Sequence, residues 1–193
     1  MAPIRVLDRL ERILRGFRAD TRGVSAVEFA MVLPLMVILF VGVVQVSELA
    51  SLKRKTTLVA RAVADLVSQL QQIDQAEMNN VMAAGTAVVA PYNTSKLKIR
   101  VTSVKIDGNK NATVVWSKVN GSSSDWSASS AGSPVALDAA LKVPNTHLIL
   151  GEARYSYNPS VGYGLTGALG LTGGDVSDKI YMRPRLSEKV DWK

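Results

Sequence analysis

The sequence contains no cysteine and only one histidine. Without cysteine the chain has no disulfide, no thiol nucleophile, no thiolate metal site and no attachment point for a lipoprotein-type acyl group. His147 alone can supply at most one ligand of a metal site. It lies in the apolar stretch Thr146–Leu150, a position that favours a strand residue over a ligand. We therefore expect neither a bound metal nor a cofactor.

The common enzyme motifs are also missing. The sequence has no Gly-x-Ser-x-Gly elbow, and no lysine follows a glycine-rich stretch to form a phosphate-binding loop. Gly162–Gly167 matches the glycine-rich dinucleotide pattern, but Pro184 and Arg185 lie near the place where that pattern requires an acid. A flexible loop is the better interpretation of this stretch. A nucleotide-binding enzyme is thus the weakest alternative, and we expect no enzymatic activity.

The positive charge of the chain is not arranged for nucleic acid. Six of the 23 basic residues are arginines in residues 1–22, and the rest of the net charge of +7 is diffuse. A nucleic-acid interface needs a clustered basic face, so we expect no nucleic-acid partner. The arginines interleave with apolar residues at steps of three or four, namely Ile4, Leu7, Leu10, Leu14 and Phe17. This spacing predicts a basic amphipathic helix suited to an anionic membrane surface.

One long apolar segment follows this basic head. Phe29–Val44 contains no charged residue, and the segment counted from Val24 to Val46 has 23 residues. As a helix it would span about 34 Å, so it is long enough to cross a hydrocarbon core of about 30 Å. A cleaved secretory signal fits less well, because its apolar part is shorter and ends at a small-x-small site, whereas Glu48 stands three residues before Ser51.

The basic residues on the two sides of the segment indicate its orientation. Six arginines precede it, and Lys53, Arg54, Lys55 and Arg61 follow it. By the positive-inside rule this difference favours a cytoplasmic N-terminus, with the C-terminal domain in the periplasm.

A single carboxylate, Glu28, lies just inside the apolar segment. An ionised acid in such a segment costs about 2.5 to 3.5 kcal/mol on insertion scales, so a plain anchor has no use for it. Two explanations are open at this point. Either Glu28 pairs with a cation, or it lies close enough to the lipid headgroups to stay hydrated.

The helical period continues beyond the membrane segment. Neither proline nor glycine occurs between Val43 and Gly85, so we expect the helix to continue into the aqueous domain. Apolar residues form one stripe at steps of three, four and seven, namely Leu52, Val59, Val63, Leu66, Leu70 and Ile73. The stripe favours packing on the protein's own sheet over a short coiled coil. Asp74-x-x-Glu77 has the form of a capping box, so a second short helix is predicted, ending at Gly85.

From Val88 the pattern changes to the alternation of strands. Leu97–Val101 and Ala112–Val119, joined across Asp107-Gly108-Asn109, predict a hairpin. Further strands are expected at Leu148–Tyr157, either as one strand or as two across Gly151, and at Lys179–Arg183. Short connections leave no room for crossover helices, so the sheet should be antiparallel, with three to five strands. The Ser-rich tract Asn120–Ser133 reads as a mobile loop that Trp126 anchors locally.

These observations divide the chain into four parts. Residues 1–23 form the basic head, 24–46 the transmembrane helix, 47–84 an extramembrane helical stalk, and 85–193 an antiparallel sheet domain with Ser/Gly-rich loops. The fold class is therefore α+β, in which a membrane helix continues into a long amphipathic helix packed on a small sheet.

The junction between head and membrane segment resembles a known family. Gly23 is followed at the fifth position by Glu28 and then Phe29, as at the prepilin processing site of type IV-related systems. More narrowly, residues 23–35, Gly-Val-Ser-Ala-Val-Glu-Phe-Ala-Met-Val-Leu-Pro-Leu, are similar to TadE-like proteins of the Tad (tight adherence) pilus apparatus. Tyr181-Met182-Arg183-Pro184-Arg185 is also of a kind that those proteins carry near their C-terminus.

The resemblance implies a pilin-like fold and a minor pilin or pseudopilin of an adhesive pilus. A membrane prepilin peptidase would remove residues 1–23 by cutting after Gly23, which leaves Val24 as the new N-terminus. Glu28 would then offset the terminal ammonium, within or between subunits. The implied partners are the peptidase, other Tad pilins or pseudopilins, and the inner-membrane assembly platform.

Departures from the family pattern favour a minor subunit. Phe29 stands where major Tad pilins usually have tyrosine, and the chain has a folded domain that the very short major pilins lack. Pro34 removes one helical hydrogen bond, which either eases extraction from lipid or serves packing. The alternative to this interpretation is an uncleaved bitopic membrane protein, with an extracytoplasmic sensing or scaffolding domain and a coincidental junction.

Overall fold

The first long element is the helix α2 (Arg22–Ser68), which continues through Pro34 without ending. The computed structural model describes residues 22–120, 125–159 and 173–193. The chain divides into two compact units, Met1–Gln45 and Val46–Lys193. Among the described residues, one helix is long and apolar enough to cross a membrane, as is typical of a single-pass membrane protein. The predicted continuation of the apolar helix into a longer one is confirmed.

The part of α2 from Val46 onward belongs to the second unit and buries one face in the core of that unit. Its fully buried side chains recur at helical spacing and include Leu52, Val59, Val63 and Val67. They share one core with residues of the sheet, so packing on the protein's own sheet is confirmed over a coiled coil. Leu66 of the predicted stripe is 39% exposed, because it lies off the buried face.

Residues 47–84, the predicted helical stalk, contain the end of one helix and most of a second. After Ser68 the chain forms the short strand β1 (Gln72–Ile73) and then α3 (Gln75–Val88). The predicted capping box is present, since the Glu77 amide donates to Asp74 Oδ1 at 2.8 Å and the Asp74 amide donates to Glu77 Oε2 at 3.4 Å.

The predicted end of this helix at Gly85 is wrong. Gly85 lies inside α3 and is buried, and α3 continues to Val88. A Cβ at this position would lie 2.8 Å from Val63 Cγ1 and 3.1 Å from Ile99 Cδ1. Glycine therefore allows α3 to approach α2 and the sheet closely, and it does not terminate the helix.

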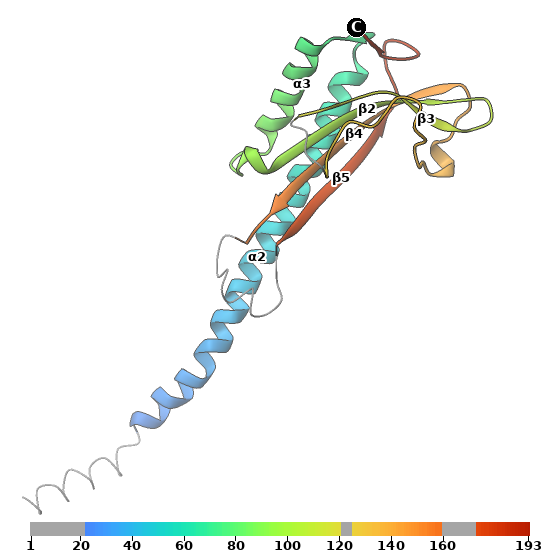
Figure 1. The fold of residues 1–193 in the computed structure, drawn as a ribbon. Helices are drawn as coiled ribbons and strands as arrows, with labels where there is room; N and C mark the ends of the chain where they lie inside the picture. The colour runs from blue at the N-terminus through green and yellow to red at the C-terminus, as the bar shows by residue number, and fades with distance from the viewer. Residues whose placement is uncertain (1–21, 121–124, 160–172) are drawn as a thin grey trace, which may run out of the picture. The chain divides into compact units, whose positions relative to one another are not determined.

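Four strands form the main sheet, in the order β3-β2-β4-β5. They are β2 (Leu97–Ile106), β3 (Ala112–Val119), β4 (Thr146–Tyr157) and β5 (Gly174–Met182). All three pairings are antiparallel, which confirms the predicted sheet and its hairpin. Figure 1 shows α2 and α3 on the same side of this sheet.

The structure settles one point that the alternation left open and corrects the bounds of one predicted strand. β4 is one strand that passes through Gly151, and β5 begins at Gly174, five residues before the predicted start at Lys179. A second sheet was not predicted: β1 pairs in parallel with β6 (Asp191–Trp192), near the C-terminus. Two short 3-10 helices, Thr94–Lys96 and Ala139–Leu141, lie in the connections.

The connecting segments agree with the sequence where they are described. Trp126 is only 4% exposed, so it anchors the Ser-rich tract as expected. His147 lies in β4, where it pairs with Lys105 of β2, and its pKa is lowered by burial and by the nearby Lys105 charge. The predicted helix in the basic head and the glycine pattern Gly162–Gly167 lie outside the described residues.

The sheet approaches α2 closely at Gly151. A Cβ built at Gly151 would lie 2.4 Å from the backbone oxygen of Ala60 and 2.9 Å from Ala64 Cβ. Helix backbone cannot move aside as a flexible side chain can, so the contact requires a residue without a side chain.

Replacing Gly151 by alanine should therefore destabilise the folded domain. Overpacking of this kind costs about 1 to 3 kcal/mol, so the thermal midpoint of the full chain in detergent should fall by several degrees. Gly174→Ala is the matched control, because a Cβ there meets nothing within 4 Å. Equal midpoints for the two variants would show that α2 does not pack on Gly151 as described.

Candidate functional site

The predicted processing positions lie in the first turn of α2. The helix begins at Arg22, so Gly23 and Val24 are already helical. A Cβ built at Gly23 meets nothing within 4 Å. A helical glycine costs about 1 kcal/mol relative to alanine, so packing within the described chain gives no reason for glycine at this position.

Glu28 lies one helical turn after Val24. Residues four apart share one face of a helix, and the rise between them is about 6 Å. The side chain of Glu28 is exposed, and the described part of the chain offers it neither a hydrogen bond nor an ion pair. Any cation that pairs with this carboxylate must therefore come from outside the described residues.

The helix around Glu28 is apolar on every side. Residues 23–37 are exposed without exception, although most of them are large and apolar. Phe29 is 60% exposed, and Pro34 lies within the same exposed stretch. A helix that is apolar all round needs lipid or other protein around it. A lone carboxylate on such a surface can recognise a cation.

Among the described residues no three His, Asp or Glu side chains come together to bind a metal.

In the second unit, polar contacts tie α2 to β5. Lys53 Nζ donates to the Ser177 carbonyl at 2.6 Å and lies 3.6 Å from Asp178 Oδ2, which also accepts a hydrogen bond from the Thr57 hydroxyl. Burial alone would raise the pKa of Asp178. The hydrogen bonds from Thr57 and the Lys179 amide, together with the charge of Lys53, outweigh burial and lower it.

A second contact joins the start of this unit to the end of β4. The Tyr157 hydroxyl donates to Glu48 Oε2 at 3.1 Å. Burial, and then the hydrogen bond and negative charge of Glu48, raise the pKa of Tyr157 to about 12. Tyr157 therefore stays protonated at neutral pH and keeps its donor on the Glu48 carboxylate.

The family-like segment Tyr181–Arg185 lies beside the C-terminal end of α2. The Arg185 amide donates to the Ser68 carbonyl at 2.8 Å, and its guanidinium lies 2.5 Å from Asp65 Oδ1. These contacts satisfy one of the last carbonyls of the helix, which otherwise lack partners. The segment that resembled the family thus contacts the C-terminal end of α2.

The contacts of Glu48, Tyr157 and Asp178 were not predicted from the sequence. Asp178 alternates with Val176 and Ile180, which belong to or pack against the core beneath α2. A carboxylate at an inward position of a strand needs a partner, so this alternation was a signal that could have been used. The Glu48–Tyr157 pair joins residues 109 apart and left no such local pattern.

Comparison with known proteins supports the resemblance. Residues 23–65 match a protein family described as TadE-like protein. The matched segment begins at Gly23 and includes Val24, Glu28, Phe29 and Pro34. Searches of curated proteins and of solved structures gave no match.

The lowered pKa of Asp178 predicts a defined pH dependence. Because the folded-state pKa lies below the ordinary value of 3.8, Asp178 contributes stability above that pH and loses it as pH falls through the folded pKa. Asp178→Asn should lower the thermal midpoint at pH 6, and the difference from the unmodified chain should shrink below about pH 3.8.

Asp138→Asn is the matched control, because Asp138 is exposed and caps its helix with no side-chain hydrogen bond. A stability difference for Asp178→Asn that stays constant from pH 6 to pH 3 would contradict the assigned contacts.

Proposed function

We propose that this chain, which is TadE-like over residues 23–65, is a minor pilin or pseudopilin of a Tad-type adhesive pilus. The observation that carries the proposal is Glu28, which has no partner among the described residues and lies in the matched segment on a helix that is exposed and apolar over residues 23–37. The chain acts without enzymatic activity. Its apolar helix rests in the inner membrane and later packs with other pilin helices.

Gly23 supports removal of the head by a prepilin peptidase. The surroundings of Gly23 leave room for a side chain, so its small size serves something other than the fold. A peptidase that binds the chain at the scissile bond would need such a small residue there. Cutting after Gly23 frees Val24 as an amino terminus and discards the arginine-rich head.

The position of Glu28 also supports cleavage after Gly23. The cut creates an ammonium at Val24, one turn from Glu28 on the same helix face. A cation held nearby relieves the cost of the carboxylate, and the positive end of the shortened helix acts in the same direction. The partner ammonium belongs either to the same subunit or to a neighbouring one.

The charge pattern supports the orientation. The arginine-rich head stays on the cytoplasmic side, and residues 46–193 face the periplasm or, after assembly, the pilus surface. Other Tad pilins and the inner-membrane platform are the proposed partners. The second candidate function, a permanent bitopic anchor with a sensing or scaffolding domain, keeps the head and has no use for Glu28.

The first prediction of this proposed function concerns the mature N-terminus. Mass spectrometry of the protein from its host should show loss of residues 1–23, and Gly23→Leu should abolish that loss. Gly42→Leu is the matched control, because Gly42 also lies in α2 with nothing within 4 Å of a built Cβ. An intact unmodified chain in cells with active peptidase would exclude the pilin-like assignment in favour of the permanent anchor.

The second prediction concerns Glu28. Glu28→Gln should insert into the membrane at least as well as the unmodified chain, because the amide is cheaper to bury, but it should lose pilus assembly or capture of partner pilins. Co-purification with partner pilins and counts of pili on cells measure this loss. Glu188→Gln makes the same chemical change at an exposed position of the sheet domain and should assemble normally. Normal assembly of the Glu28 variant would favour the permanent anchor.

A further inference from the structure

The part of α2 in the second unit has a face that the core does not cover. On this face Leu58 is 51% exposed, and Arg54 and Arg61 are exposed as well. Residues three or four apart lie on one face of a helix, so Leu58 lies between the two arginines along the helix. We call Arg54, Leu58 and Arg61 the outer row of α2.

The two arginines of the outer row make neither a hydrogen bond nor an ion pair within the described residues. The other charged side chains of α2 in this unit all contact another element: Lys53 contacts Asp178, Lys55 the Ala90 carbonyl, Asp65 the Arg185 guanidinium, and Glu48 the Tyr157 hydroxyl. Two guanidinium groups on either side of an exposed leucine are therefore available to an anionic partner.

Phospholipid headgroups cannot serve both arginines. The apolar segment ends at Val46, and at 1.5 Å per residue Arg54 lies about 12 Å and Arg61 about 22 Å beyond it along the helix. The headgroup layer extends only about 5 to 8 Å beyond the hydrocarbon core on each side. An extended side chain at Arg54 reaches that layer, but one at Arg61 does not. The anionic partner of the whole row is therefore not the membrane surface.

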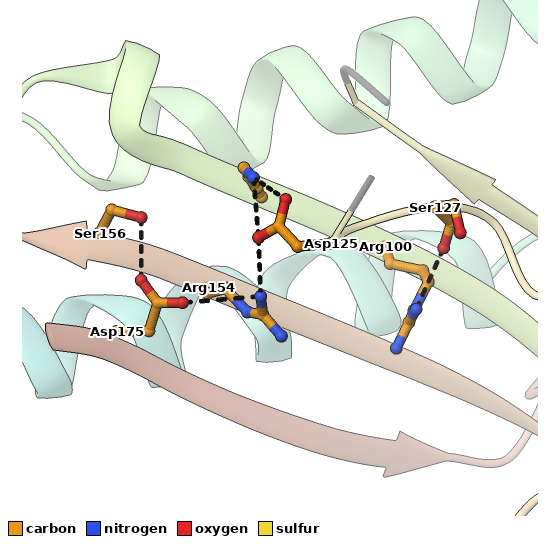
Figure 2. A network of polar contacts seen from close by, with 7 residues as sticks. Arg100, Asp125, Ser127, Arg154, Ser156 and Asp175 are labelled. Carbon is orange, nitrogen blue, oxygen red and sulfur yellow. Dashed lines mark hydrogen bonds and ion pairs between the residues drawn. The ribbon is translucent and has the colours of Figure 1, made fainter. Parts of the chain in front are cut away.

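Most acids of the second unit already have partners. Figure 2 shows Arg154 between Asp125 and Asp175, at distances of 3.2 and 3.5 Å. Both oxygens of Glu152 accept hydrogen bonds from Arg100, at 2.6 and 2.9 Å. The other acids of this unit that have partners are Glu48, Asp65, Asp74, Glu77, Asp107, Asp178 and Asp191.

A second copy of this chain therefore fits the outer row poorly. Among the described residues of the second unit, only the side-chain carboxylates of Asp138 and Glu188 lack a hydrogen bond and an ion pair, and they lie in separate connecting segments. Two single acids so placed do not match two arginines on one helix face. Parallel packing of two outer rows would also bring arginine against arginine, which like-charge repulsion disfavours.

We propose that the outer row of α2 docks an acidic helix of a different pilus subunit. The planar guanidinium of arginine binds carboxylates with two parallel hydrogen bonds, and Leu58 supplies an apolar contact between the two ion pairs. Arg54 and Arg61 are about 10.5 Å apart along the axis, so acids seven residues apart on a neighbouring helix would match them.

The two parts of this assignment have different support. The acidic chemistry of the partner follows from the free arginines and from the shortage of free acids in this chain. Its identity as a pilus subunit rests on the proposed function, in which the apolar part of the same helix packs with other pilin helices.

The test places a photo-cross-linker in the outer row of the full chain in its host. After irradiation of cells that carry p-benzoylphenylalanine at position 58, tandem mass spectrometry of the cross-linked peptide should identify a helix of another pilus subunit with two Asp or Glu residues. In that background, Arg54→Glu combined with Arg61→Glu should lower the cross-link yield at least about tenfold, because like-charge repulsion replaces the ion pairs.

Lys105→Glu combined with Lys179→Glu is the matched control. Both lysines are exposed residues of the sheet, so the net charge changes equally and the cross-link should persist. All four side chains are exposed, and neither pair of substitutions should shift the thermal midpoint of the chain in detergent.

The docking surface would be overturned by the absence of a cross-link or by equal yields in the two double variants. A cross-link to a lipid, to a second copy of this chain, to a segment without acids or to a protein outside the pilus would overturn the assigned partner. The mature N-terminus is measured in the same samples. A chain that lacks residues 1–23 but gives no cross-link would contradict the docking surface and leave the proposed function standing.

Discussion

The dominant physical constraint on this chain is an exposed apolar helix that carries one carboxylate. Residues 23–37 of α2 have no cover within the described chain, so in water this surface would drive aggregation. Lipid can cover it, and so can the helices of other subunits. Glu28 adds a second constraint, because an acid in such a surface is tolerated only where a cation or water can reach it.

In the second unit the same helix follows ordinary globular packing. One face of α2 is buried beneath the sheet, and small residues set the distance, with Gly151 against Ala60 and Ala64. The contacts of Lys53 and Thr57 with Asp178 fix the helix to β5, and Arg185 fixes its C-terminal end. The two parts of α2 therefore differ in exposure. One face is covered in the second unit, whereas every face is exposed from residue 23 to 37.

Much of this arrangement follows from local patterns. The absence of proline and glycine after Val43 predicted the long helix, Asp74 and Glu77 predicted the start of α3, and the alternation at Leu97–Val101 predicted a strand of the sheet. Gly85 was misread because glycine has two uses, ending a helix or permitting a close approach, and only tertiary contacts distinguish them. The β1–β6 pair could not be predicted, because two-residue strands carry no periodic signal and their partners lie more than 100 residues apart.

The candidate site also has a part that local sequence predicts and a part that it does not. The junction around Gly23 and Glu28 is local in sequence, so it was predictable from the chain alone. The Glu48–Tyr157 pair joins residues 109 apart, so no local pattern reveals it.

The central claim is that Glu28 meets an ammonium that cleavage creates at Val24. Solid-state NMR of assembled protein, with ¹⁵N in valine and ¹³C in the glutamate side-chain carboxyl, measures this directly through their dipolar coupling. The account predicts a valine ammonium signal coupled to the Glu28 carboxylate at an ion-pair distance, with nitrogen and oxygen within about 4 Å. A Val24 nitrogen that is still an amide, or an ammonium without coupling to Glu28, would contradict it.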